Sequence, residues 1–121
     1  MMKVGITCRM TEESAYSEVR NSLALDWIEF FERLQVMPVL IPNGLKEPGE
    51  YCADLGLDAI ILSGGNNISP KLYQSEQELD DVYEIRDQTE YDIIDYCIKN
   101  DIPLLGICRG MFLINAYFKG S

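Results

Sequence analysis

The residues best suited to chemistry lie in the run Gly106-Ile107-Cys108-Arg109-Gly110. This run has the form Gly-x-nucleophile-x-Gly between a predicted strand and a predicted helix, which is the setting of a nucleophile elbow. The two glycines let the strand and helix backbones approach each other closely. The thiol would lie at a helix N-terminus, where the helix macrodipole favours the thiolate. We therefore predict that Cys108 is a nucleophile; the alternative is a core cysteine beside two packing glycines.

A second candidate feature is the turn Gly64-Gly65-Asn66, which follows a strand-like apolar run. A Gly-Gly turn leaves backbone N–H groups open to a reacting carbonyl oxygen, so the Gly65 N–H and the Arg109 N–H are predicted as the two donors of an oxyanion hole. Gly64 and Asn66 are candidates for substrate binding. A Gly-Gly pair after a strand is usually only a turn. Its weight here comes from sharing one edge of the sheet with Cys108.

Two arginines are further candidates for substrate binding. Arg9 follows the first predicted strand and could bind a carboxylate, although a plain surface arginine is equally consistent with that position. Arg86 stands four residues before Glu90 on a predicted helix. This spacing is typical of a solvated ion pair within a helix. The functional alternative places Arg86 near the mouth of the substrate site.

The elements that position these residues alternate between strand and helix. Continuous apolar runs predict strands at 3–8, 37–41, 57–62 and 103–107. Helices are predicted at 23–34, 48–56, 82–100 and 108–118, with a long loop at 9–20. This order indicates an α/β fold with an open, mostly parallel sheet and helices on both faces, in one domain over 1–121. Ligands bind such sheets beyond the carboxyl ends of the strands, where Arg9, Gly65 and Cys108 should meet.

The composition excludes several classes of partner. Ten Lys and Arg residues stand against 20 Asp and Glu residues, and the net charge of −10 opposes binding to nucleic acid or to anionic membranes. No apolar run approaches the length of about 20 residues that a membrane span needs, and the start lacks a secretion signal. The four cysteines are scattered and no histidine occurs, so we expect no metal site; without a glycine-rich phosphate loop we expect no nucleotide cofactor. Unpaired cysteines fit a reducing compartment, and we predict a cytoplasmic location.

Three segments resemble the class I glutamine amidotransferase superfamily, in its γ-glutamyl hydrolase branch (peptidase C26). They are GITCR, then IILSGGNNISPKLY with the later RDQTEYDII, and PLLGICRGMFLINAYFKGS. The resemblance implies a flavodoxin-like fold and a small γ-glutamyl amide substrate. It also implies that Cys108 attacks the γ-glutamyl carbonyl, that Gly65 and Arg109 hold the oxyanion, and that water hydrolyses a thioester. The opening segment also resembles a sub-branch that cleaves γ-glutamyl-CDP-amidate. Asn67 stands where the family often has an aspartate.

The family's catalytic triad also needs a histidine and a carboxylate from later strands. Since these 121 residues contain no histidine, we expect the chain to be the N-terminal part of such an enzyme, truncated after the elbow helix and inactive alone. An open sheet edge would favour self-association or a complementing chain. Two alternatives remain: a non-catalytic ligand-binding or interaction module, and one subunit of a split glutaminase.

Overall fold

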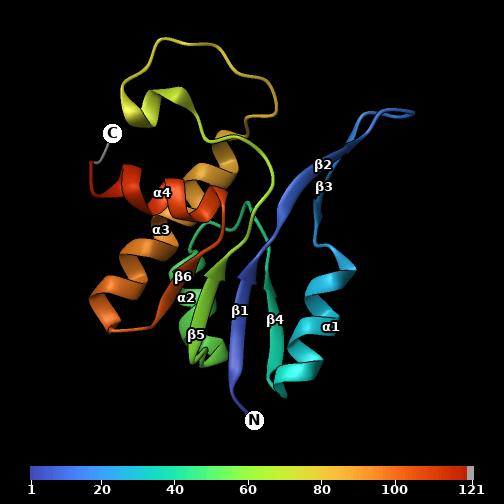
Figure 1. Cartoon of the computed structure of the whole chain (residues 1–121), viewed down its shortest axis with the longest axis vertical. Helices are drawn as coiled ribbons and strands as arrows, with labels where there is room; N and C mark the ends of the chain where they lie inside the picture. The colour runs from blue at the N-terminus through green and yellow to red at the C-terminus, as the bar shows by residue number, and fades with distance from the viewer. Residues whose placement is uncertain (120–121) are drawn as a thin grey trace.

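A parallel four-stranded sheet forms the centre of the computed structural model, which describes residues 1–119. Its spatial order is β4-β1-β5-β6 (Figure 1), with bounds β1 Lys3–Thr7, β4 Met37–Ile41, β5 Ala59–Leu62 and β6 Leu104–Gly106. Each strand is a short apolar run, as expected for strands covered on both faces. The chain therefore has the predicted α/β architecture with an open parallel sheet.

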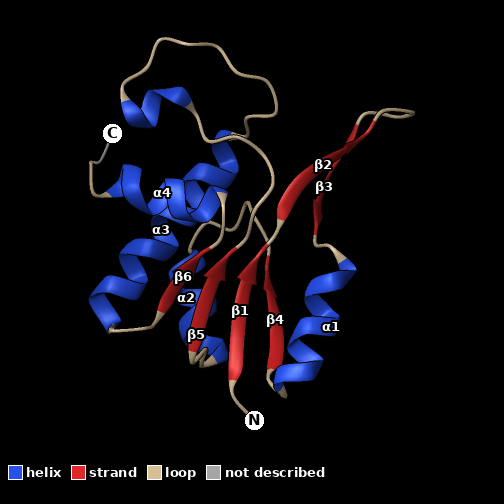
Figure 2. Cartoon of the chain, viewed as in Figure 1, coloured by secondary structure: helices blue, strands red, loops and turns tan. Residues whose placement is uncertain are grey.

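Helices cover both faces of this sheet (Figure 2). Their bounds are α1 Leu25–Leu34, α2 Pro48–Leu55, α3 Glu84–Asn100 and α4 Arg109–Tyr117. Successive side chains of a strand point to opposite faces of the sheet, so neighbouring residues of β5 pack against different helices. Ile60 and Leu62 pack with α2, α3 and α4, whereas Ile61 packs with Phe31 of α1. Among residues 1–119, no helix is long and apolar enough to cross a membrane.

Residues 9–20 were expected to form a loop, and that prediction is wrong. They belong to an antiparallel hairpin of β2 (Arg9–Glu13) and β3 (Glu18–Ser22), which projects beyond the end of the sheet (Figure 1). Most of its side chains are exposed, so it has no apolar periodicity for a sequence pattern to reveal. Its base is fixed instead by Asn21, whose side-chain oxygen accepts the Asn43 N–H at 2.9 Å.

Helix α3 differs from expectation in the face that it buries. The helical spacing of apolar residues over 82–100 predicts that Ile85 and Ile98 point inward, yet each is about half exposed, at 50% and 48%. The buried face carries Arg86 and Glu90 together with apolar residues further along the helix. The apolar pattern alone therefore gave the wrong orientation for one residue in the first turn of α3 and one in its last turn.

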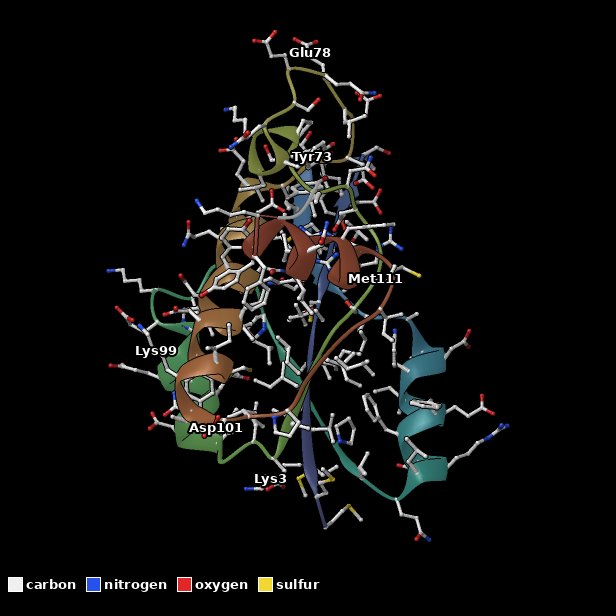
Figure 3. The ribbon with its side chains drawn as sticks, turned by 60° about the vertical axis from the view of Figure 1, so that its left-hand side comes forward. Lys3, Tyr73, Glu78, Lys99, Asp101 and Met111 are labelled. Atoms are coloured by element: carbon white, nitrogen blue, oxygen red, sulfur yellow. The ribbon has the colours of Figure 1, made fainter. Side chains whose placement is uncertain are left out.

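The carboxyl ends of β1, β5 and β6 meet at one edge of the fold, as predicted. Ser63, after β5, donates from its hydroxyl to the Thr7 carbonyl at 2.7 Å, and Ile107 donates from its N–H to the Leu62 carbonyl at 3.0 Å. Tyr73 and Glu78 lie toward this end of the molecule, whereas Lys3 and Asp101 mark the other end (Figure 3).

Strand β6 forms one edge of the sheet among the described strands, and Leu105 on it is 54% exposed. An open strand edge and exposed apolar side chains both favour association. Self-association of this chain stays a prediction.

Candidate active site

Cys108 occupies the sharp turn between β6 and α4, and its side chain is exposed. Its backbone has φ 50° and ψ −104°, in a region that residues other than glycine rarely adopt. Such a conformation costs about 1–3 kcal/mol and persists only where the surroundings impose it. Here β6 and α4 impose it through the glycines on either side: a Cβ on Gly106 would lie 2.7 Å from the Met111 nitrogen. The local geometry is that of a nucleophile elbow.

The strain at this turn leads to a prediction about stability. Glycine adopts a positive φ freely, so Cys108→Gly should raise the free energy of unfolding by about 1 kcal/mol after the entropy of the more flexible unfolded chain is subtracted. Cys108→Ala keeps the strain and should give no such gain. Chemical denaturation of the two variants measures the difference. Equal midpoints would show that the turn is relaxed.

The Gly64–Gly65 turn lies directly beside the cysteine. The position of a Cβ on Gly64 is 3.6 Å from the Cys108 Cβ, and Gly65 has φ +84°, in the left-handed region. Within residues 1–119, neither the Gly65 N–H nor the Arg109 N–H donates a hydrogen bond to another protein group. The two N–H groups predicted as oxyanion donors therefore belong to residues close to Cys108 and have no acceptor among the described residues.

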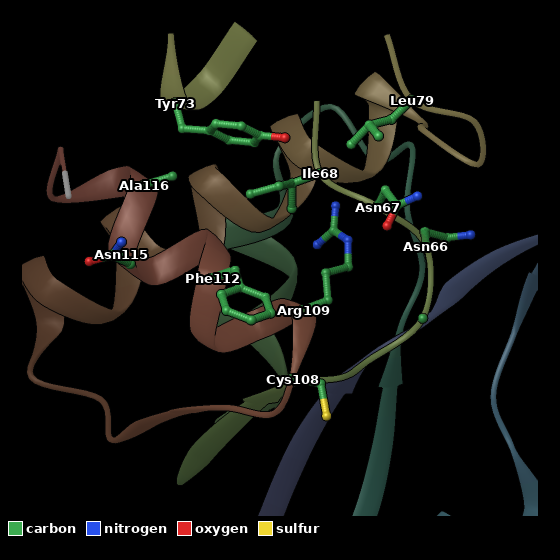
Figure 4. Close-up of a pocket in the computed structure, with 11 residues that line it drawn as sticks. Asn66, Asn67, Ile68, Tyr73, Leu79, Cys108, Arg109, Phe112, Asn115 and Ala116 are labelled. Carbon is green, nitrogen blue, oxygen red and sulfur yellow. The ribbon is translucent and has the colours of Figure 1, made fainter. Parts of the chain in front are cut away.

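A pocket of about 450 Å³ extends from this turn. Cys108 lies at one end of it and Tyr73 at the other (Figure 4). Its polar side is formed by the elbow and the Gly-Gly turn, namely Gly65, Asn66, Asn67, Cys108 and Arg109. Its apolar side is formed by Ile68, Tyr73, Leu79, Phe112 and Ala116. Tyr73 ends the short helix η1 (Pro70–Tyr73). The pocket has the common form of a small-molecule site, with apolar walls and a few convergent polar groups.

Beneath the turn lies a cluster of four buried charges, contributed by α3 and the start of α4. Arg86 and Glu90 have 0% exposed surface, and Arg86 Nε donates to Glu90 Oε2 at 3.1 Å. The Arg109 guanidinium donates to Glu90 Oε1 and to Asp87 Oδ1. Two positive and two negative groups balance, as buried charges must. Arg86 and Glu90 are therefore not the solvated ion pair that their spacing suggested.

Burial shifts the pKa values of two groups in this cluster, Asp87 and Arg86. It raises the pKa of the Asp87 carboxyl, and the Arg109 guanidinium opposes that rise. Burial likewise lowers the pKa of Arg86, and Glu90 opposes that fall. In both cases desolvation is the larger effect. The cluster therefore depends on each charge keeping its partner.

The substrate-binding candidates occupy different positions around the turn. Arg86 lies under it, donating to the carbonyl oxygens of Ser63 and Gly65 at 2.8 and 2.6 Å. The exposed Arg9 side chain lies against Gly65, since a Cβ added to Gly65 would be 2.8 Å from Arg9 Nε. Asn66 lines the pocket, but its side chain pairs with the Met10 backbone at 2.8 and 3.0 Å. The structure thus brings Arg9, Gly64, Gly65, Asn66, Arg109 and Cys108 together, with Arg86 behind them.

Some residues at the site were missed by sequence reasoning. The Arg109 side chain, and its pairing with Asp87 and Glu90, were not foreseen, nor was the apolar wall that includes Tyr73 and Phe112. The pattern Arg86-Asp87-x-x-Glu90 carried a usable signal, because three charges on one side of a helix can form a network with a cation from elsewhere. Within residues 1–119, no group of three or more His, Cys, Asp or Glu side chains could hold a metal ion.

Comparison with known proteins identifies relatives of the chain. The family model described as Peptidase C26 matches residues 3–121. The gamma-glutamyl-CDP-amidate hydrolase of Campylobacter jejuni is 38% identical over 98% of this chain and 56% of the relative. A Schizosaccharomyces pombe protein named as a candidate glutamine amidotransferase is 44% identical over 69% of this chain and 33% of its own length. The gamma-glutamyl-gamma-aminobutyrate hydrolase PuuD of Escherichia coli is 34% identical over 62% of this chain and 30% of its own length. The chain spans about half or less of the length of these relatives.

Proposed function

Because this chain belongs to the peptidase C26 family, within the class I glutamine amidotransferase superfamily, we propose that it supplies the nucleophile of a cysteine-dependent hydrolase that cleaves γ-glutamyl amide bonds. One observation carries the proposal: the exposed Cys108 lies in a strained elbow, beside a pocket and two unused backbone donors. Two of the relatives are named for different amides that share the γ-glutamyl group. That shared group is the part of the substrate that we assign to this chain.

The geometry supports a two-step acyl transfer. The Cys108 thiolate attacks the γ-carbonyl carbon, and the carbonyl oxygen gains the negative charge, which the N–H groups of Gly65 and Arg109 stabilise. The C–N bond then breaks, the amine leaves with a proton from a general acid, and a γ-glutamyl thioester remains on Cys108. Water attacks the thioester, which releases glutamate and regenerates the thiol.

Arg9 and the Gly-Gly turn have supporting roles in this proposal. The exposed Arg9 guanidinium beside Gly65 is the group that we assign to the α-carboxylate of the glutamyl substrate, since arginine binds carboxylates through paired hydrogen bonds. Gly64 and Asn66 shape the turn that presents the oxyanion donors.

The proton carrier of the reaction is not among these residues. None of the 121 residues is a histidine, and we propose that a group outside them supplies the base, from a longer chain or from another chain. General acid–base catalysis typically contributes about 10²–10⁴-fold to the rate. The 121 residues alone should therefore form the thioester with a reactive acyl donor and release it slowly. The free cysteines suit a reducing compartment, so we place the protein in the cytoplasm.

The test of this function is selective labelling with the chloromethyl ketone analogue of glutamine. The Cys108 sulfur attacks its methylene carbon and displaces chloride. We expect this ketone to label Cys108 at least about tenfold faster than chloroacetone, which lacks the glutamyl group. Excess glutamine should slow the labelling by the glutamine analogue. Peptide mass spectrometry locates the label. Cys52 and Cys97 should stay unlabelled in the folded chain, since both are buried and burial raises their pKa values to about 11 and about 12.

Cys108→Ala is the control and should take up no label. If both ketones react with Cys108 equally fast and glutamine gives no protection, the site does not recognise a γ-glutamyl group. The proposed function would then be wrong, and a ligand-binding module of other specificity would be the better description.

A further inference from the structure

We propose that Arg86 and Glu90 are positioning residues that jointly fix the two oxyanion donors, one on the Gly-Gly turn and one on the elbow. The inference rests on the proposed function, since it concerns the same oxyanion hole. Neither side chain reaches solvent, as both have 0% exposed surface. Each acts through the backbone that it holds.

The first step concerns the direction of the Gly65 N–H. In a trans peptide the carbonyl and the N–H of one peptide unit point in opposite directions. The Gly64 carbonyl oxygen accepts from Arg86 Nη1 at 3.3 Å, and the preceding Ser63 carbonyl oxygen accepts from Arg86 Nη2 at 2.8 Å. Both carbonyls therefore face the buried guanidinium. The Gly65 N–H consequently faces away from Arg86, on the accessible side of the turn that lines the pocket.

The second step concerns the other donor, the Arg109 N–H at the start of α4. The side chain of the same residue is anchored to Glu90 through Oε1, and Glu90 holds Arg86 through Oε2 at 3.1 Å. One carboxylate thus connects the support of the turn with the support of the elbow. A shift of either donor would pull against Glu90. The pair of N–H groups is therefore held at one spacing, which is what stabilisation of a developing oxyanion requires.

The third step explains why arginine is needed at position 86. Its guanidinium donates hydrogen bonds at the same time to the carbonyl oxygens of the Gly-Gly turn and to the carboxylate of Glu90. The carbonyl oxygens are those of Ser63, Gly64 and Gly65. A lysine ammonium is a point charge with three donors and no rigid fork, so it can neutralise Glu90 but cannot hold the turn in the same way. Arg86→Lys therefore separates the charge of the residue from its geometry.

The experiment compares two reactions of the same thiol. Acylation of Cys108 by the p-nitrophenyl ester of the glutamate γ-carboxyl builds negative charge on the carbonyl oxygen, whereas alkylation by iodoacetamide displaces iodide and builds no oxyanion. Both rates are measured for the wild type, Arg86→Lys, Glu90→Gln and the control Glu84→Gln. Glu84 lies on the same helix with its carboxylate exposed, so this control makes the same change of charge outside the cluster. Denaturation curves confirm which variants are folded.

We expect the ratio of acylation to alkylation rates to fall at least about tenfold in Arg86→Lys and Glu90→Gln and to stay unchanged in Glu84→Gln, since loss of one oxyanion donor costs about 10²–10³ in rate. A merely structural role would lower both rates together or neither. Glu90→Gln leaves buried charge unpaired and can prevent folding; Arg86→Lys then decides alone, because it keeps a cation beside Glu90. A wild-type ratio in folded Arg86→Lys would overturn the inference and leave the proposed function standing. A wild type acylated no faster than N-acetylcysteine would overturn both.

Discussion

Gly110→Ala is expected to cost about 3 kcal/mol or more of folding free energy, which is a large part of the 5–15 kcal/mol typical of a domain. A Cβ at this position would lie 2.8 Å from the Leu62 Cβ and 3.1 Å from the Leu62 carbonyl carbon. Leu62 cannot move aside, because its side chain is fully buried and its carbonyl accepts the Ile107 N–H at 3.0 Å. The elbow and β5 are therefore packed backbone against backbone. The midpoint of urea unfolding measures the loss.

Gly49→Ala provides the matched control for this substitution. Its added Cβ would lie 3.3 Å from the Cβ and one ring carbon of Tyr96, so a shift of only a few tenths of an ångström between α2 and α3 would relieve the contact. Alanine also favours the helix in which Gly49 lies. We expect a change within about 1 kcal/mol for this variant. Similar midpoints for Gly110→Ala and Gly49→Ala would mean that the elbow is not closely packed on β5.

The second large effect concerns acylation. With the γ-glutamyl p-nitrophenyl ester, wild-type chain should release a burst of one equivalent of p-nitrophenolate, because this leaving group needs no proton from a general acid. Release should then slow by about 10²-fold or more, since no imidazole base activates water for hydrolysis of the thioester. Absorbance after rapid mixing follows both phases.

Cys108→Ala should show no burst, and Cys108→Ser is the stricter control because it keeps a nucleophilic atom in the same turn. A serine hydroxyl is a weak nucleophile without a base, so this variant should also lack the burst. A burst of equal size in either variant would assign the acylation to another residue.

The sequence was most informative where residue type dictates backbone geometry. The glycines around Cys108 and the apolar runs of the strands predicted the elbow, the parallel sheet and the shared edge where Arg9, Gly65 and Cys108 lie. These features are local, because a sharp turn needs glycine and a covered strand needs a continuous apolar run. Features of this kind can therefore be predicted from the sequence without knowledge of the tertiary contacts.

The features that the sequence did not reveal depend on contacts between distant segments. The hairpin of β2 and β3 is fixed at its base by Asn21 and Asn43, not by an apolar face. The burial of Arg86 and Glu90 depends on Arg109, 19 residues after Glu90 in the chain, which supplies the balancing charge. On helix α3 alone these residues are indistinguishable from a surface ion pair. Only the packing of α4 and the Gly-Gly turn against them shows that both side chains are buried and which groups they pair with.

The central claim is that these residues hold a competent nucleophile and oxyanion hole but no base. Intact-mass measurement of the wild-type chain after one exposure to the γ-glutamyl p-nitrophenyl ester tests it most directly. We predict a persistent species heavier by one γ-glutamyl group, which peptide mapping places on Cys108 and hydroxylamine removes, as expected for a thioester. Sustained turnover that depends on Cys108 would show that a base is present among the 121 residues, and absence of the adduct would show that Cys108 is not the nucleophile. Either result would contradict the claim.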